Sequence, residues 1–240
     1  MTQTALYRQD AYLTAAPARV VAVEEGGVLL DRCLFYPRGG GQPGDRGVLE
    51  TSAGPVAVVE ALKAADGVSS VLTLEEGAAA PAVGDGVTQR LDEGFRRGCM
   101  RVHTALHLLS VALPLPVTGG SISPDKGRLD FDMEAPPEDK DALQAALQAL
   151  IDGDHEVSEE WITDAELEAN PGLVKTMAVK PPMGHGRVRL VRIGRREATV
   201  DLQPCGGTHV RSTGEIGRVR IGKIEKKGKR NRRVNLHLEP

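Results

Sequence analysis

Apolar and polar residues alternate with a strand-like period over roughly the first ninety residues of the chain. The stretch "ARVVAVEEGGVLLDRCLFYP" (18–37) predicts two strands joined at a Gly-Gly pair, and "GPVAVVEALKAADGVSSVLTL" (54–74) repeats this pattern around an Asp-Gly pair. A further short strand is predicted in "GDGVTQRLD" (84–92). Several short strands at this close spacing predict a small barrel or a sandwich.

The hydrophobic period changes to a helical one near Asp92. In "DEGFRRGCMRVHTALHLLSVAL" the apolar residues recur mostly three or four positions apart, which predicts a helix over 93–113 with Asp92 as its N-cap. Prolines directly after this stretch end the helix. We therefore divide the chain into an N-terminal domain of residues 1–92 and a second domain of residues 93–240.

The second domain mixes helices with strands. The stretch "EDKDALQAALQALIDG" predicts a second helix, which Pro137 opens and Gly153 ends, and a short helix is predicted at 164–169. Strands are predicted in "RLDFDM", "HEVSEEWIT", "RVRLVRIG", "EATVDL" and "GEIGRVRIGKIEKKGKRNRRVNLHL". This order of elements predicts an α+β domain.

Composition indicates the cellular compartment in which the protein acts. The N-terminal stretch has no long apolar run, and no part of the chain reaches the roughly 20 apolar residues that a membrane-spanning helix needs. The odd number of cysteines, three, favours thiols that are buried, metal-binding or catalytic over disulfides. We therefore expect no signal peptide, no membrane contact and a cytoplasmic localisation.

Charge is distributed unevenly along the chain. Residues 1–95 carry 7 Lys/Arg against 13 Asp/Glu, residues 96–179 carry 7 against 15, and residues 180–240 carry 16 against 5. A basic C-terminal quarter on an otherwise acidic chain favours contact with a polyanion, although a solvated basic hairpin explains the same charge.

Four side chains with metal-binding chemistry occur as two closely spaced pairs. His103 and His107 in "HTALH" lie on one face of the predicted helix, because residues four apart are neighbours on a helix surface. Cys205 and His209 in "PCGGTHV" are also four apart, and the two glycines between them allow the backbone to bend so that both can face one ion. Three histidines and one cysteine form a set that zinc binds tetrahedrally.

Other catalytic signatures are missing from the sequence. A zincin protease carries Glu directly after the first histidine of its pair, but Thr104 stands at that position. The chain has no G-x-S-x-G elbow and no Walker-type phosphate loop, and we expect no nucleotide cofactor.

Three motifs resemble those of the alanyl-tRNA editing proteins (AlaX) and of the editing domain of alanyl-tRNA synthetase. They are "HTALHLL" at 103–109, "PCGGTHV" at 204–210 followed by "STGEIG" at 212–217, and "FYPRGGGQPGDRG" at 35–47. The resemblance covers nearly the whole chain, and the last motif is typical of longer members with an N-terminal β-barrel. It implies an α+β fold, in which a small N-terminal β-barrel precedes a zinc-containing editing domain of the threonyl/alanyl-tRNA synthetase second additional domain type. The chain is too short for an aminoacylation domain as well, so we expect a free-standing protein.

The resemblance implies hydrolysis in trans of mischarged tRNA(Ala). The bond cleaved is the ester between a wrong amino acid, chiefly serine, and the terminal adenosine. A synthetase pocket shaped for alanine rejects only weakly an analogue that adds a hydroxyl, so a second, hydrolytic site must separate the two. Carried over by position, the Zn²⁺ ligands are His103, His107, Cys205 and His209.

Several residues are candidates for contacts with the substrate. Thr118 stands where the family places a polar residue that contacts the serine side chain, and Gly119 and Gly120 follow it; the alternative is a turn residue before two glycines. Asp201 and Gln203 are expected to orient a ligand or a water molecule, unless they only end a strand.

The tRNA itself is expected to contact the basic segment near the C-terminus, which contains no aromatic residue. Its cations are Lys223, Lys226, Lys227, Lys229, Arg230, Arg232 and Arg233.

The glycine-rich loop "PRGGGQPGD" is a weaker signal. Backbone N–H groups at Gly39, Gly40 and Gly41 could cradle a phosphate, but strand-like sequence follows the loop where a nucleotide site would need a helix. We expect a loop between the domains that shapes the substrate pocket, and a long tight turn is the alternative.

Two questions stay open at the level of sequence. Four protein ligands close a zinc site, so zinc either loses a ligand, expands its coordination, or orients the substrate while water is activated elsewhere. The same four ligands and basic segment would also serve a non-catalytic zinc-stabilised RNA-binding module, or a metal hydrolase of a small ester or amide.

Overall fold

The computed structural model describes residues 3–24, 27–175 and 186–240, and these form two units, Met1–Gly98 and Cys99–Pro240. The predicted turn between the first two strands includes residues 25–26, which lie outside the described residues. None of the helices in the described part of the chain combines the length and the apolar composition needed to span a bilayer.

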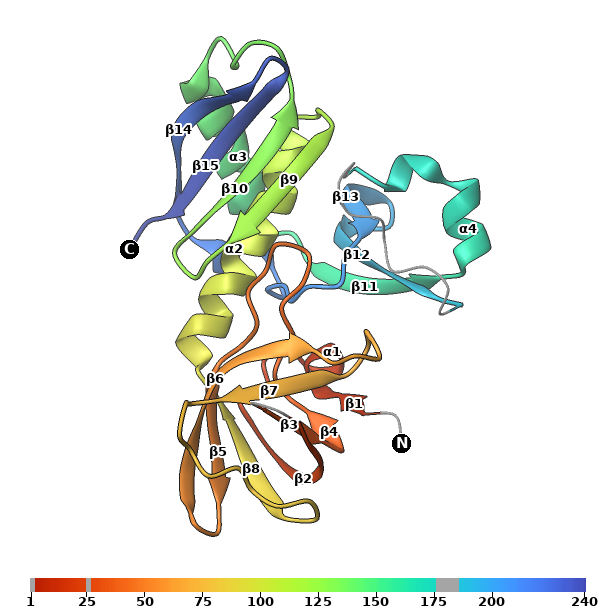
Figure 1. The fold of residues 1–240 in the computed structure, drawn as a ribbon. Helices are drawn as coiled ribbons and strands as arrows, with labels where there is room; N and C mark the ends of the chain where they lie inside the picture. Colours follow the sequence, from red (N-terminus) through yellow and green to blue (C-terminus); the bar gives the residue numbers. More distant parts are fainter. Residues whose placement is uncertain (1–2, 25–26, 176–185) are drawn as a thin grey trace. The chain divides into compact units, whose positions relative to one another are not determined.

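The first unit is built on a closed six-stranded barrel (Figure 1), which decides between the predicted barrel and sandwich. Its strands are β2 (Ala15–Glu24), β3 (Gly27–Leu30), β5 (Gly47–Thr51), β6 (Gly54–Lys63), β7 (Ser70–Leu74) and β8 (Gly86–Leu91). The barrel closes because β8 pairs with both β2 and β5, so every strand has two neighbours. Residues of its strands, among them Leu30, Leu49 and Leu72, are fully buried and form its core together with Phe35 from the loop after β4 (Arg32–Cys33). A short parallel pair, β1 (Thr4–Ala5) and β4, and the helical turn α1 (Leu6–Gln9) complete the unit.

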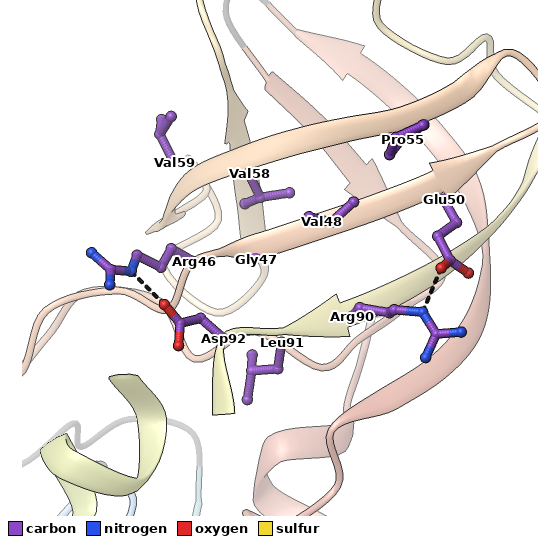
Figure 2. A pocket seen from close by; sticks show the side chains of 10 residues that line it. All are labelled: Arg46, Gly47, Val48, Glu50, Pro55, Val58, Val59, Arg90, Leu91 and Asp92. Carbon is purple, nitrogen blue, oxygen red and sulfur yellow. Dashed lines mark hydrogen bonds and ion pairs between the residues drawn. The ribbon is translucent and has the colours of Figure 1, made fainter. Parts of the chain in front are cut away.

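The barrel carries a surface groove of about 690 Å³ (Figure 2). Val48 and Pro55 form part of its apolar wall, and ion pairs lie at its two ends: Arg46–Asp92, 2.9 Å, and Arg90–Glu50, 2.5 Å. The four charged side chains are paired with one another, and no histidine or cysteine lines the groove, so we place no chemistry there.

A fully buried ion pair fixes the glycine-rich segment in the first unit. Arg96 and Asp45 are each 1% exposed, and Arg96 Nε lies 2.9–3.0 Å from both carboxylate oxygens of Asp45. The guanidinium also donates to the carbonyls of Ala11 (2.8 Å) and Leu34 (3.0 Å). Protein acceptors thus replace the water molecules that this buried charge has lost. The first turns of helix α2 (Glu93–Ala112) are thereby tied to the segment that contains the glycines.

The predicted helix over 93–113 is confirmed as α2, and Asp92 caps it by accepting from Phe95 N at 3.0 Å. The second helix, α3 (Lys140–Asp152), starts three residues later than predicted. Asp139 is its N-cap, because its carboxylate accepts a hydrogen bond from Ala142 N at 2.8 Å. Pro137 has no polar side chain that could accept from a helix N–H in this way.

The second unit contains a four-stranded sheet in the order β14-β15-β10-β9. Its strands are β9 (Val117–Ile122), β10 (Lys126–Asp132), β14 (Val219–Gly228) and β15 (Asn231–Leu238). Helix α3 lies against one face of this sheet (Figure 1), and the amide of Gln144 donates to Val219 O and accepts from Ile221 N of the edge strand. Gly127 on β10 lets α2 come close, since a Cβ at that position would lie 2.6 Å from Val102 Cγ1.

A three-stranded antiparallel sheet, in the order β11-β12-β13, completes the second unit. Its strands are β11 (Val157–Ile162), β12 (Val188–Arg195) and β13 (Ala198–Pro204), and the predicted short helix is α4 (Asp164–Ala169), with a capping box at Thr163. The predicted strand beginning at "GEIG" is corrected: Thr213–Ile216 form a 3₁₀ turn, and β14 starts at Val219. The mixed sheets and helices confirm the α+β prediction for this half of the chain.

We expect Arg96→Met to lower the free energy of unfolding by about 3–5 kcal/mol, because it leaves the Asp45 carboxylate buried without its partner. Arg90→Met is the matched control, since Arg90 forms a solvent-exposed pair with Glu50, and exposed pairs add little to stability. Urea denaturation followed by far-UV circular dichroism measures both values. Equal effects of the two substitutions would contradict the structural role of Arg96.

Candidate metal centre

Helix α2 supplies two of the four predicted ligands. His103 and His107 are each 7% exposed, and their ring centroids lie 5.2 Å apart. Val102, Leu106 and Leu109 are buried beside them, so the apolar face that packs the helix also carries both imidazoles inward.

The other two ligands come from the end of β13 and the loop that follows it. Cys205 N donates to Arg189 O of β12 at 3.2 Å, so strand pairing fixes the cysteine in place. The chain then reverses, with Gly207 N donating to Cys205 Sγ at 3.4 Å. As a result Cys205 Sγ lies 3.3 Å from His209 Nε2 and 3.5 Å from His103 Nε2.

One ligand atom from each of the four residues lies within 4.8 Å of the other three. Atoms bound tetrahedrally to zinc at its usual bond lengths lie about 3.3–3.8 Å apart, so small movements bring these atoms to coordination distance. Three buried imidazoles and one half-buried thiol therefore form a group that fits a metal ion.

Hydrogen bonds fix the orientation of two of the imidazoles. His107 Nδ1 donates to Asp201 Oδ2 at 2.9 Å, and His209 Nδ1 lies 3.1 Å from Thr104 Oγ1. The Thr104 hydroxyl donates to Met100 O at 2.9 Å, so its oxygen accepts from His209. In both rings Nδ1 then carries a proton, and Nε2 is the nitrogen that faces the centre of the group.

The carboxylate of Asp201 is itself held on several sides. It is 2% exposed, accepts from Gln203 Nε2 at 2.8 Å, and forms an ion pair with Lys175 Nζ through its second oxygen. The carbonyl of Lys175 accepts from Val117 N at 3.2 Å, which connects this network to strand β9. Asp201 and Gln203, both singled out in the sequence, thus lie behind the imidazole of His107.

Burial and charge act in opposite directions on the titratable groups. Burial raises the pKa of the Cys205 thiol, but His103 and His209 lower it more, so the net pKa is well below its usual value. Burial, assisted by His103, lowers the pKa of His209 to about 3. Burial also lowers the pKa of His107, but the hydrogen bond to Asp201 and the nearby Cys205 raise it to about 9 overall. A thiolate beside a neutral His209 is the protonation state that a metal ion binds.

The structure places Thr118, Gly119 and Gly120 on strand β9, so the turn interpretation of these residues is wrong. Thr118 Oγ1 donates to Asp130 O at 3.1 Å and accepts from Asn231 Nδ2 at 3.1 Å. A role in substrate contact stays a prediction for all three.

The glycine-rich loop lies within the first unit and not between the two units, which corrects the prediction of an inter-domain loop, and its middle forms a tight turn. Gly39 and Gln42 exchange two backbone hydrogen bonds of 3.0 Å, and Gly40 and Gly41 between them have φ of 59° and 82°. Positive φ at both central positions is typical of a type I′ turn and explains why glycines occur there. The predicted part of Gly39, Gly40 and Gly41 in the substrate pocket stays a prediction.

The predicted tRNA-contacting cations are distributed along the β14–β15 hairpin, and the structure corrects one of them. Arg232 is 7% exposed and donates to the carbonyls of Gly228, Asn231 and Glu134, so it supports the hairpin internally. Arg233 is half-buried and binds both carboxylate oxygens of Asp130 at 2.8 and 3.0 Å.

The remaining cations of the hairpin are exposed. Arg230 pairs with Asp132, and Lys227 with Glu225 at 2.7 Å. Lys223, Lys226 and Lys229 project from the hairpin as exposed side chains.

Sequence reasoning missed three residues that support the centre. Thr104 was considered only as the residue that replaces a catalytic Glu, although it holds His209. Lys175 lies in an irregular segment where no periodicity marks it. Arg189 Nη1 donates to the carbonyls of Cys205 (2.7 Å) and Gly207 (3.0 Å) and so fixes the loop between two ligands, whereas in the sequence it is one basic residue among many.

Two family models match the chain. The model for the threonyl and alanyl tRNA synthetase second additional domain matches residues 188–235, which include Cys205 and His209. The model for class II (A) tRNA synthetases matches residues 7–95, which include the barrel.

Curated relatives extend the similarity over the whole chain. The chain is 35% identical over 244 residues to the alanyl-tRNA editing protein AlaX-M of Methanosarcina mazei, covering 98% of this chain and 96% of that protein. It is 31% identical over 243 residues to AlaX-M of Saccharolobus solfataricus, covering 98% of each. It is 32% identical to an alanine–tRNA ligase of Caldivirga maquilingensis, with 92% of this chain but only 25% of the ligase covered.

We expect Asp201→Asn to weaken metal binding by about 10- to 100-fold, because the imidazole of His107 loses its carboxylate partner. Asp130→Asn is the matched control, since Asp130 holds Arg233 and no ligand of the centre. Titration of the folded protein with Zn²⁺ in competition with a chelating indicator measures the affinities.

Cysteine variants test the ligand assignment in the same Zn²⁺ titration. Cys205→Ala should bind Zn²⁺ far more weakly than the parent, whereas Cys33→Ala and Cys99→Ala should bind it normally, because neither of these buried thiols belongs to the group. Equal retention in all three variants would refute the assignment.

Proposed function

Because the chain belongs to the family of alanyl-tRNA editing proteins, we propose that it deacylates mischarged tRNA(Ala) in trans, with seryl-tRNA(Ala) as its main substrate. The observation that carries this proposal is the group of three buried histidines and one half-buried cysteine in a chain similar to AlaX-M over nearly its whole length. The reaction adds water across the ester and releases serine and the free 3′-terminal ribose hydroxyl.

His103, His107, Cys205 and His209 would hold Zn²⁺, an ion whose affinity for mixed nitrogen and sulfur donors suits this set. When bound, zinc would supply Lewis-acid polarisation or fix an electron-rich group of the substrate. Asp201 stays ionised, since His107 and Lys175 bring its pKa below its usual range despite burial, and its hydrogen bonds hold His107 in position. An aminoacyl ester is already labile, so exact positioning by these fixed side chains supplies much of the rate enhancement.

Selection of serine requires a contact that alanine lacks. The Thr118 hydroxyl donates its proton to Asp130 O, so towards a ligand its oxygen acts as an acceptor. A serine hydroxyl can donate to that oxygen, whereas the alanine methyl group cannot. Val117 and Lys175 join this part of β9 to the network around Asp201, which supports a place for Thr118 beside the substrate.

Purified protein should release serine from seryl-tRNA(Ala) much faster than alanine from alanyl-tRNA(Ala). Thr118→Val keeps the side-chain shape but removes the acceptor, which should reduce this preference by a few-fold to roughly tenfold, the equivalent of about 0.5–1.5 kcal/mol. Thr199→Val, on an exposed hairpin of the same unit, is the control. Single-turnover deacylation rates for both substrates decide the matter, and an unchanged preference in Thr118→Val would remove Thr118 from the specificity site.

The exposed cations of the β14–β15 hairpin are suited to the phosphates of the tRNA. Residues 223–236, which carry these cations, include no aromatic side chain, so the contact is electrostatic and releases counterions. Lys223, Lys226 and Lys229 are the residues through which we propose that contact.

Replacing Lys223, Lys226 and Lys229 with Ser should flatten the dependence of log Kd on log salt by up to about one unit per lost phosphate contact. The KM for deacylation should rise, while the rate at saturation falls less, because the ester reacts at the metal centre. A control that replaces the exposed Lys63, Lys140 and Arg195 with Ser removes the same charge elsewhere. Identical salt slopes for the two triple variants would show that only net charge matters.

A further inference from the structure

The chain contains one tryptophan, Trp161 on β11, and 42% of its surface is exposed. Arg187 Cζ lies 5.9 Å from the centroid of the indole ring, in the range of a cation–π contact. Internal packing therefore leaves a large part of this aromatic surface available, with a guanidinium against it.

Strand register places Trp161 in the same row as a metal-binding residue. Trp161 pairs with Arg189 on β12, and Cys205 N donates to Arg189 O at 3.2 Å. Directly opposed residues of antiparallel strands project to the same face, so Trp161, Arg189 and Cys205 share one face of the sheet. With β11, β12 and β13 adjacent (Figure 1), two strand spacings of about 4.7–4.9 Å each separate the tryptophan from the cysteine.

Neighbouring residue pairs of β12 and β13 show which other side chains share this face of the sheet. Val191 pairs with Gln203, and Ile193 pairs with Asp201, so both polar residues behind His107 project from the face that carries Trp161. The indole thus lies at the rim of the face whose buried part holds the metal centre.

We propose that Trp161 and Arg187 form a stacking platform for the terminal adenine of the acylated tRNA, while the ester lies at the metal centre. The proposal rests on the proposed function, because the adenine and the ester belong to the same nucleotide. One ribose separates the adenine from the ester. The distance across that ribose is similar to the two strand spacings between Trp161 and Cys205.

Physical chemistry favours this occupant. The 3′ end of a tRNA is single-stranded, and unpaired bases bind proteins by stacking on aromatic rings and guanidinium planes. Residues 223–236 of the basic hairpin contain no aromatic ring on which a base could stack. Arg187 adds a positive charge beside the indole, which favours the phosphate that precedes the adenosine.

The first test uses the fluorescence of the single tryptophan, which reports on Trp161 alone. The zinc-loaded protein is titrated with an alanine acceptor-stem RNA that carries serine through a non-hydrolysable amide at its terminal adenosine. The matched probe has the same RNA and amide-linked serine on an abasic terminal ribose. We expect strong quenching with the first probe and little with the second at equal saturation; equal quenching by both probes, or by neither, overturns the proposal.

The second test is kinetic. Trp161→Leu should raise the KM for seryl-tRNA(Ala) by about 5- to 150-fold with a smaller change in kcat, and Trp161→Phe should restore most of the loss. Zinc content shows whether either variant disturbs the centre, and the fluorescence titration of the parent decides the question if Trp161→Leu does not fold. An unchanged KM in a folded Trp161→Leu variant refutes the platform.

The two levels of the proposal fail separately. A parent protein that does not hydrolyse seryl-tRNA(Ala) refutes the proposed function, yet the non-reactive probes still report whether a terminal adenine contacts Trp161. A parent that hydrolyses the ester and is quenched equally by the abasic probe keeps its function and loses the platform.

Discussion

Four side chains that could hold a metal ion come together at one point of the second unit, and contacts with distant segments hold them there. Two of them, His103 and His107, come from successive turns of α2, and the other two follow β13 about a hundred residues later. An imidazole can turn either nitrogen to the centre, so the histidines need partners at Nδ1. Asp201 and Thr104 provide these partners for His107 and His209.

Those partners in turn explain the surroundings of the centre. A buried carboxylate such as Asp201 is stable only with compensating charge and hydrogen bonds, which His107, Gln203 and Lys175 supply. The Lys175 carbonyl then binds Val117 N, so the chain of polar contacts reaches a strand of the other sheet. Hydrogen bonds and an ion pair around His107 thus connect helix α2 with both sheets of the second unit.

In the first unit, a buried ion pair holds distant segments together. Asp45 follows a glycine-rich turn that could adopt many conformations, and the guanidinium of Arg96 fixes it through a buried two-oxygen contact. The same guanidinium binds the carbonyls of Ala11 and Leu34, so one side chain holds three segments of the unit together. Such a residue resembles a surface arginine in the sequence, because nothing local distinguishes it from Arg97 beside it.

Local features of the sequence determined much of this protein. The helical period fixed α2 and placed His103 and His107 on one face, and the spacing of Cys205 and His209 completed the ligand set, because these relations depend only on neighbouring residues. Tertiary structure decided what depends on distant partners. Strand β9 was hidden by Gly119 and Gly120, which have low strand propensity, and exists because β10 pairs with it. In the same way, the burial of Arg232, the acceptor role of Thr104 and the pairing of Lys175 with Asp201 arise from segments far away in the chain. The periodicity of the sequence does not predict such contacts, since they form only when the fold brings two distant residues together.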